Sequence, residues 1–264
     1  MVVTTIQTHL YLPRVSMEDI FTVILLSLLP GAGNFLGALA AEARAPSARS
    51  LNWALHAASG IVIAIVAVEL IPGALEQIAG WWVALAFAIG GLSYIALDSI
   101  VKRLQGTSDG AGNRRMWMIY AAVAIDLMSD GLMTGTGASV SLKWALVLSA
   151  GQVLADVPEG YAAAANFRSK GIARARRISL SVLFFVYVVG AAVAAYFLLR
   201  GAPGQIKAGG LAVVSGLLAV GAIEDMLQEA HDVHVDSQPS VIAFIGGFSL
   251  FTLVSAGLGA FVGR

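Results

Sequence analysis

The sequence contains no cysteine among its 264 residues, and charged residues make up only 12% of it. Without cysteine, disulfide bonds, thiolate metal ligands and thiol nucleophiles are excluded. Soluble domains carry about 25% charged residues, so the scarcity of charge, with 58% hydrophobic residues, indicates a membrane protein. The net charge is zero, which gives no overall positive field and no indication of a nucleic-acid partner. No basic stretch precedes the first apolar run, so no cleavable signal peptide is expected.

Long apolar runs separated by short polar breaks make up most of the chain. A helix needs about 20 mostly apolar residues to cross a bilayer. Eight runs meet this length, at residues 18–41, 52–77, 81–102, 115–138, 142–166, 176–199, 207–230 and 239–262. Because all the loops between them are short, we expect one all-α transmembrane domain over residues 1–264, surrounded by a lipid bilayer.

Basic residues predict the orientation of these spans. Eleven of the 16 lysines and arginines fall in the loops after the first, third and fifth spans. Loops rich in these residues remain in the cytoplasm, so we expect both termini outside it, in a cell (inner) membrane. The eleven are Arg44, Arg49, Lys102, Arg103, Arg114, Arg115, Arg168, Lys170, Arg174, Arg176 and Arg177.

A short internal repeat links the second and seventh spans. Residues 68–72 are Val-Glu-Leu-Ile-Pro, and residues 223–227 are Ile-Glu-Asp-Met-Leu. With eight spans, these two helices run in opposite directions. Such a pair is typical of inverted repeats arranged around a site at the membrane midplane.

Carboxylates inside the spans are the strongest indication of function. A charged side chain at the bilayer centre costs about 2.5–3.5 kcal/mol on insertion scales, and no lysine or arginine lies in a span core to offset it. The acids must therefore be protonated, face water or bind a cation. They are Glu69, Asp98, Asp126, Asp130, Asp156, Glu159, Glu224 and Asp225.

Four of these acids are expected to form one site. Asp126 and Asp130 are spaced i, i+4 on the fourth span, so they share a helix face. Asp156 and Glu159 are spaced i, i+3 on the fifth span and share a face in the same way. A short turn makes the two spans antiparallel neighbours, with all four acids near mid-membrane. Two facing pairs of carboxylates predict a cage for a divalent metal ion.

Residues around the four acids favour the same interpretation. Pro158 removes the backbone hydrogen bond to Leu154, which bends the helix and frees a carbonyl toward a cavity. Ser129 and Gln152 add polar atoms along the expected pathway. Glycines on both spans allow close helix approach; they are Gly131, Gly135, Gly137, Gly151 and Gly160.

The fourth and fifth spans resemble the ZIP family of divalent-metal transporters. The family patterns are His-Asn-x-x-(Asp/Glu)-Gly and His-(Glu/Asp)-x-Pro-Glu-Gly; here residues 126–131 are Asp-Leu-Met-Ser-Asp-Gly and residues 155–160 are Ala-Asp-Val-Pro-Glu-Gly. The acidic segments of the second and seventh spans are also similar to those of the family. The resemblance implies an inverted-repeat bundle that moves divalent ions toward the cytoplasm by alternating access. A homodimer is left open.

Departures from the family pattern bear on the identity of the ion. Asp126 and Ala155 stand where the family has histidine, Leu127 stands where it has asparagine, and the sixth span lacks a carboxylate. We therefore expect one ion at a time, held by Asp126, Asp130, Asp156 and Glu159. Imidazole suits zinc, whereas carboxylates suit harder ions such as manganese. Strict selectivity for zinc over manganese or iron is therefore not expected.

Polar residues beyond the cage suggest a route for the ion. Glu69, Glu224 and Asp225 lie along the second and seventh spans, and two histidines at i, i+3, His231 and His234, follow the seventh. These histidines are expected to receive an ion that leaves toward the cytoplasm; a solvated acidic loop is the alternative. His56 is interpreted as a residue at headgroup level.

Three other functions are left open by the residues. Two aspartates on neighbouring spans also occur in intramembrane aspartyl enzymes, although the Gly-x-Gly-Asp pattern of those enzymes is absent here. A proton-coupled carrier of an organic solute would also use buried acids. The third is a ZIP-like protein that binds metal but no longer transports it. Metal transport, with no enzymatic activity, is the function that we expect.

Overall fold

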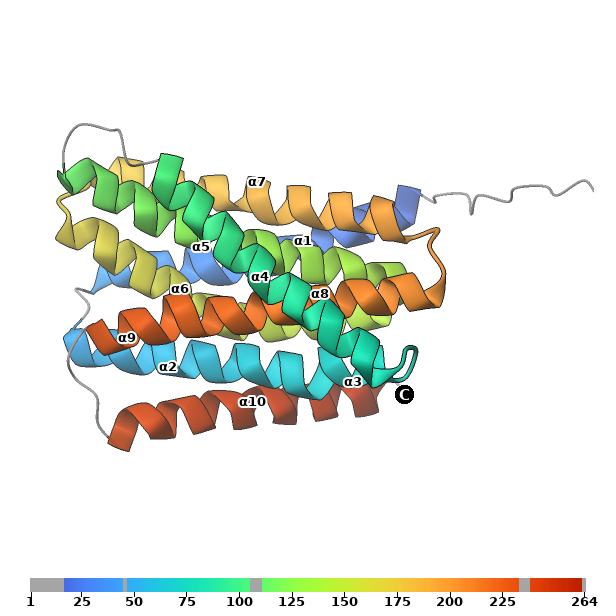
Figure 1. Cartoon of the computed structure of the whole chain (residues 1–264). Helices are drawn as coiled ribbons and strands as arrows, with labels where there is room; N and C mark the ends of the chain where they lie inside the picture. The colour runs from blue at the N-terminus through green and yellow to red at the C-terminus, as the bar shows by residue number, and fades with distance from the viewer. Residues whose placement is uncertain (1–16, 45–46, 105–110, 233–237, 263–264) are drawn as a thin grey trace, which may run out of the picture.

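The chain folds into a bundle of long helices in this computed structural model (Figure 1). The structure describes residues 17–44, 47–104, 111–232 and 238–262, and every regular element within these ranges is helical. The elements are α1 (Met17–Ala43), α2 (Ala48–Ala64), η1 (Ile65–Leu70), α3 (Ile71–Leu75), α4 (Gly80–Leu104), α5 (Ala111–Val140), α6 (Leu142–Ser169), α7 (Arg174–Leu199), α8 (Gly204–Gly221), η3 (Ala222–Leu227), α9 (Gln228–Asp232) and α10 (Gln238–Val262). Since α2, η1 and α3 form one continuous rod, as do α8, η3 and α9, the described chain makes eight rods, as predicted.

Six of these rods are long and apolar enough to cross a membrane by length and composition. The other two are α5 and α6, which carry the four central acids and are therefore less apolar on average. Their 30 and 28 residues give lengths of about 45 and 42 Å at 1.5 Å per residue. Both lengths exceed the hydrocarbon core of a bilayer, about 30 Å. The molecule is an all-α membrane protein.

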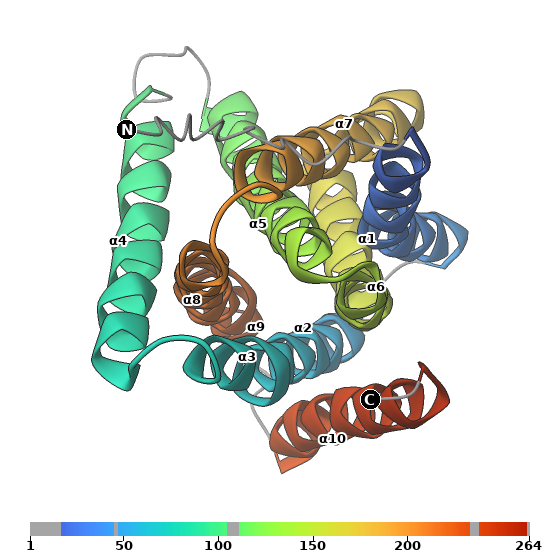
Figure 2. The same cartoon turned by 90° about the vertical axis from the view of Figure 1, so that its right-hand side faces the viewer.

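The central acids lie on the helices at the middle of the bundle. Seen end-on, α5 and α6 are surrounded by the other rods, while α4 and α10 lie at the periphery (Figure 2). Large apolar side chains on the peripheral helices are more than half exposed, including Ile89 and Leu92 on α4 and Ile242 and Leu253 on α10. Such surfaces suit contact with lipid. The described chain begins and ends at the same end of the bundle (Figure 1).

Glycines at the helix crossings reveal two related halves. At the α2–α10 crossing, a Cβ on Gly60 would meet the backbone carbonyl of Phe244, and a Cβ on Gly247 would meet that of Ala57. The α8–α4 crossing repeats this arrangement, with Gly216 against Phe87 and Gly90 against Val213.

The α1–α6 and α5–α7 crossings form a second related pair, with Gly37 and Gly160 at the α1–α6 crossing and Gly131 and Gly135 at the α5–α7 crossing. The predicted close approach of the span glycines is therefore confirmed at Gly131, Gly135 and Gly160.

The repeated acidic segments share an unusual backbone. Residues 65–70 and 222–227 both form π-helical turns, η1 and η3, within otherwise α-helical rods. Such turns are rare and are frequently found at functional sites. The sequence offset that relates Gly60 to Gly216 pairs Glu69 with Asp225, not with Glu224. The repeat thus places one carboxylate near each end of the bundle.

Candidate metal site

The structure brings the four central acids together between α5 and α6. Asp126, Asp130 and Asp156 each present a carboxylate oxygen within 4.8 Å of the other two. Their exposed fractions are 4%, 0% and 1%, and that of Glu159 is 6%. The Glu159 carboxyl adjoins that of Asp126. Four carboxyl groups therefore converge from two helices into a space closed to bulk water.

No donor from another described residue satisfies the centre of this cluster. Both carboxylate oxygens of Asp130 and of Asp156 are buried without a hydrogen-bond partner, as are Oε2 of Glu159 and Oε1 of Gln152. A buried polar atom without a partner costs about 1–3 kcal/mol, and more when it is charged. Such a cluster needs shared protons, water or a bound cation to complete it.

Helix α1 forms a wall of the site that the sequence did not predict. A Cβ on Gly33 would lie 3.1 Å from the Cβ of Asp156, and the backbone of Asn34 packs against Gly160. Asn34 is 1% exposed, and both polar atoms of its side chain lack a partner among the described residues. A single polar residue among the glycines of an apolar span was the signal available in the sequence. It becomes meaningful only once α1 is known to cross α6 at this level.

The other predicted pathway residues differ in their surroundings. The Ser129 hydroxyl is turned to its own helix, where it donates to the Ile125 carbonyl at 2.8 Å. Gln152 is buried one helical turn from Asp156. Glu69 lies near the other end of the bundle, where its carboxylate accepts hydrogen bonds from Trp144 Nε1 (3.0 Å) and from the Ser255 hydroxyl. Glu224 is exposed on the surface of η3.

Asp225 forms a link between the central acids and one end of the bundle. Its carboxylate accepts a hydrogen bond from the Tyr94 hydroxyl, and the Tyr94 ring packs beside Gly221 together with Asp126. Glu229 is close enough to interact electrostatically with both Asp225 and Glu159. Acidic side chains therefore continue from the centre toward α9.

His231, at that end, contacts a residue that the sequence did not pair with it. Its ring meets that of His56 edge to face, with centroids 5.6 Å apart. His56 was interpreted as a residue at headgroup level; the structure shows that its side chain is packed inside the bundle, with 6% exposure. His234 and Asp236 lie outside the described residues.

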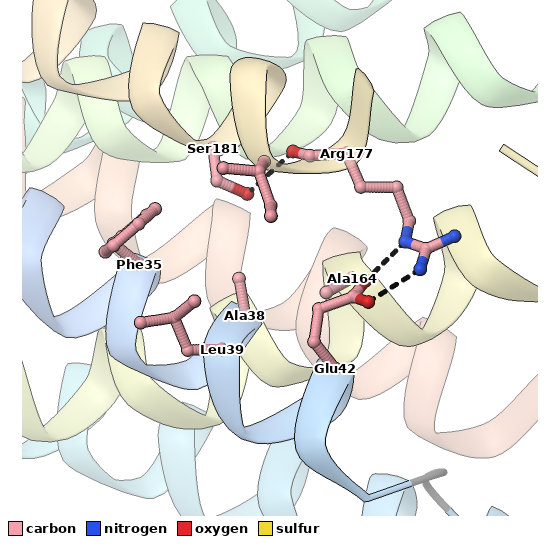
Figure 3. A pocket seen from close by; sticks show the side chains of 8 residues that line it. Phe35, Ala38, Leu39, Glu42, Ala164, Arg177 and Ser181 are labelled. Carbon is pink, nitrogen blue, oxygen red and sulfur yellow. Dashed lines mark hydrogen bonds and ion pairs between the residues drawn. The ribbon is translucent and has the colours of Figure 1, made fainter. Parts of the chain in front are cut away.

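A nearby ion pair provides a contrast with the central acids. Glu42 on α1 accepts hydrogen bonds from both Nε and Nη2 of Arg177 on α7, the latter at 2.7 Å (Figure 3). The pocket around them is otherwise lined largely by apolar side chains, including Phe35 and Leu39. Because the guanidinium neutralises this carboxylate, Glu42 is not a candidate ligand for a cation.

Comparison with known proteins agrees with this architecture. No family model matches the chain. The chain is 26% identical over 256 residues to a protein named Zinc transporter ZupT from Escherichia fergusonii, covering 89% of this chain and 98% of the relative. Proteins of the same name from Salmonella paratyphi A and Salmonella newport are 25% identical with the same coverage. The similarity extends well beyond the motifs of the fourth and fifth spans. The chain is therefore a divergent relative of these zinc transporters, and its resemblance to the ZIP family is confirmed.

Proposed function

We propose that this protein moves divalent metal ions, zinc among them, across the membrane through a site formed by Asp126, Asp130, Asp156 and Glu159. The observation that supports the proposal most directly is the convergence of three buried carboxyl groups within 4.8 Å, two of which, Asp130 and Asp156, have no hydrogen-bond partner among the described residues. Relatives named as zinc transporters support the substrate class.

A cation is the simplest group that completes the cluster. Oxygen ligands bind zinc at about 2.0–2.2 Å, so two of them on one ion lie at most about 4.4 Å apart. A set of oxygens within 4.8 Å therefore needs only small side-chain rotations, or a bridging water, to close on an ion. No described residue brings an imidazole to the site, so its chemistry accommodates manganese and iron as well as zinc.

Direction follows from the basic loops. The end of the bundle where α1, α4 and α6 finish carries most of the lysines and arginines, so it is the cytoplasmic end in this proposal. An ion then comes from the side of the termini and leaves past Asp225 and Glu229. The related halves supply the two alternative packings that alternating access requires.

Uptake into liposomes tests the proposal. The purified protein, reconstituted with a zinc-sensitive dye inside the vesicles, is expected to admit Zn²⁺, while Asp130→Asn and Glu159→Gln are expected to reduce the signal to that of empty liposomes. Glu76→Gln is the matched control, because Glu76 is exposed beyond α3 and is expected to leave uptake unchanged. Normal uptake by both central variants would refute the carboxylate site.

Two further measurements separate the alternatives. If the wild-type protein binds zinc but never admits it, the chain is a metal-binding relative without transport. Competition of zinc uptake by Mn²⁺ and Fe²⁺ tests the expected breadth of selectivity, and failure of both to compete would contradict it.

A further inference from the structure

Two histidines that are 175 positions apart meet at the predicted cytoplasmic end of the bundle. The chain has only four histidines, and the two whose side chains the structure describes, His56 on α2 and His231 on α9, form this ring contact. Both helix ends lie at the same end of the bundle (Figure 1). The contact brings imidazole chemistry to an end of a pathway whose centre contains only carboxylates.

The hydrogen bond of His56 fixes which of its nitrogens is available. Nδ1 lies 2.9 Å from the backbone carbonyl of Asn52. A carbonyl only accepts hydrogen bonds, so Nδ1 carries the proton and Nε2 carries the lone pair. Metal-binding histidines are oriented in this way, with the second nitrogen donating to a carbonyl or carboxylate.

A buried network holds the two histidines in place. The Asn52 side chain is 0% exposed; its amide nitrogen donates to the carbonyl of Ala230 at 2.9 Å, and its oxygen accepts from the Ser240 hydroxyl at 2.5 Å. Asn52 lies one turn before His56, and Ala230 immediately precedes His231. One side chain therefore ties α2, α9 and α10 together beside both rings.

The spacing of the rings fits an ion between them. A zinc–nitrogen bond of about 2.0–2.1 Å, with the radius of the imidazole ring, places the metal about 3.2 Å from each ring centroid. Two centroids 5.6 Å apart then subtend an angle of about 120° at the metal, near the tetrahedral value. Small rotations of the rings suffice to point both lone pairs at one position.

We propose that His56 and His231 bind a transition-metal ion through one imidazole nitrogen each, with water completing the coordination shell. Because His231 is exposed, the ion has a path to solvent. Imidazole favours zinc and similar ions over manganese. This site therefore adds, at the end of the pathway, a preference for zinc over manganese that the central carboxylates lack. As a step in transport the site rests on the function proposed above; as a binding site it does not.

Metal-binding stoichiometry of the full-length protein in detergent tests this site. His56→Phe with His231→Phe keeps an aromatic contact but removes both ligands, and it is expected to bind about one Zn²⁺ fewer per chain than wild type. Mn²⁺ binding, which depends on the carboxylates, is expected to be unchanged. His231→Phe alone, at an exposed position, is expected to weaken the same zinc site and serves if the double variant fails to fold.

Cysteine substitution gives a readout that ring packing would not produce. Since the chain has no cysteine, His56→Cys with His231→Cys introduces the protein's only thiols. Zn²⁺ is expected to bind this variant and to protect both thiols from alkylation. Full zinc binding by the phenylalanine variants, or thiols that zinc leaves unprotected in a folded protein, would overturn the proposal.

The outcomes also separate this site from the central one. Asp130→Asn is expected to remove central binding and leave the histidine ion in place. If the phenylalanine variants lose one zinc ion and Asp130→Asn still shows normal uptake, the histidine site is upheld and the carboxylate site is refuted. If Asp130→Asn loses uptake and the phenylalanine variants bind the full amount of zinc, the carboxylate site is upheld and the histidine site is refuted.

Discussion

Replacing Asp130 with asparagine is expected to stabilise the metal-free protein while abolishing its stabilisation by Mn²⁺. Asparagine has the same shape, so the change leaves no cavity, and it removes one charge from a fully buried cluster. Two unit charges 4.8 Å apart at an effective dielectric constant of 20 repel by about 3.5 kcal/mol, and Asp130 has two such neighbours. Protonation relieves part of this repulsion in the wild type, so the expected gain is about 1–3 kcal/mol.

Thermal unfolding in detergent, followed by the fluorescence of the five tryptophans, measures both effects. Each kcal/mol shifts the Tm of a chain near this size by about 2–4 °C. Mn²⁺ is expected to bind the central carboxylates and not the two histidines, so it reports on the central site alone. At 100 times its Kd it stabilises the wild type by about 2.7 kcal/mol, and this shift is expected to vanish in the variant.

Glu69→Gln provides a matched control for Asp130→Asn. Glu69 is equally buried, but its oxygens accept from Trp144 and Ser255. Loss of an acceptor is expected to lower the stability of the metal-free protein by about 1–3 kcal/mol, with the Mn²⁺ shift retained. A metal-free Asp130→Asn protein that is less stable than wild type, and still stabilised by Mn²⁺, would refute the electrostatic argument.

Two other predictions follow from the crossings and from the ligand type. Gly37→Val is expected to prevent folding, because the valine side chain would meet the α6 backbone at Val157. Gly190→Val is the control and is expected to fold normally, because the space around Gly190 is open. Monodispersity in size-exclusion chromatography distinguishes the two variants. Carboxylate and imidazole ligands bind metal only when deprotonated, so zinc affinity is expected to fall as pH decreases from neutral; titration calorimetry at several pH values measures this, and an affinity independent of pH would contradict carboxylate ligation.

The helices could be predicted from the sequence because each apolar run is long and bounded by polar residues. The predicted span 142–166 corresponds to α6, Leu142–Ser169, and the helix extends further because residues beyond the apolar run remain helical at the headgroup level. The pairs at i, i+4 and i, i+3 placed the four acids on facing sides because helical geometry alone determines which residues share a face.

Features that depend on distant contacts could not be predicted. The π-helical turns have no marker in local composition, and the partners of Glu69 lie on α6 and α10. The ring nitrogen of Trp144 donates to Glu69, a contact that depends on how α6 crosses the second rod. Asn34 and His56 acquire a possible role only from neighbours far along the chain.

The two repeated acids now differ in their surroundings, although the fold relates them. Glu69 is 2% exposed and bonded to Trp144 and Ser255, whereas Asp225 is only partly buried and lies beside Glu229. A transporter built from inverted repeats occupies one asymmetric state at a time and reaches the other when its halves exchange conformations. In the transport cycle proposed above, the tight enclosure of Glu69 and the looser one of Asp225 correspond to a state closed at the end with the termini. We expect the opposite state to break the hydrogen bonds from Trp144 and Ser255 to Glu69.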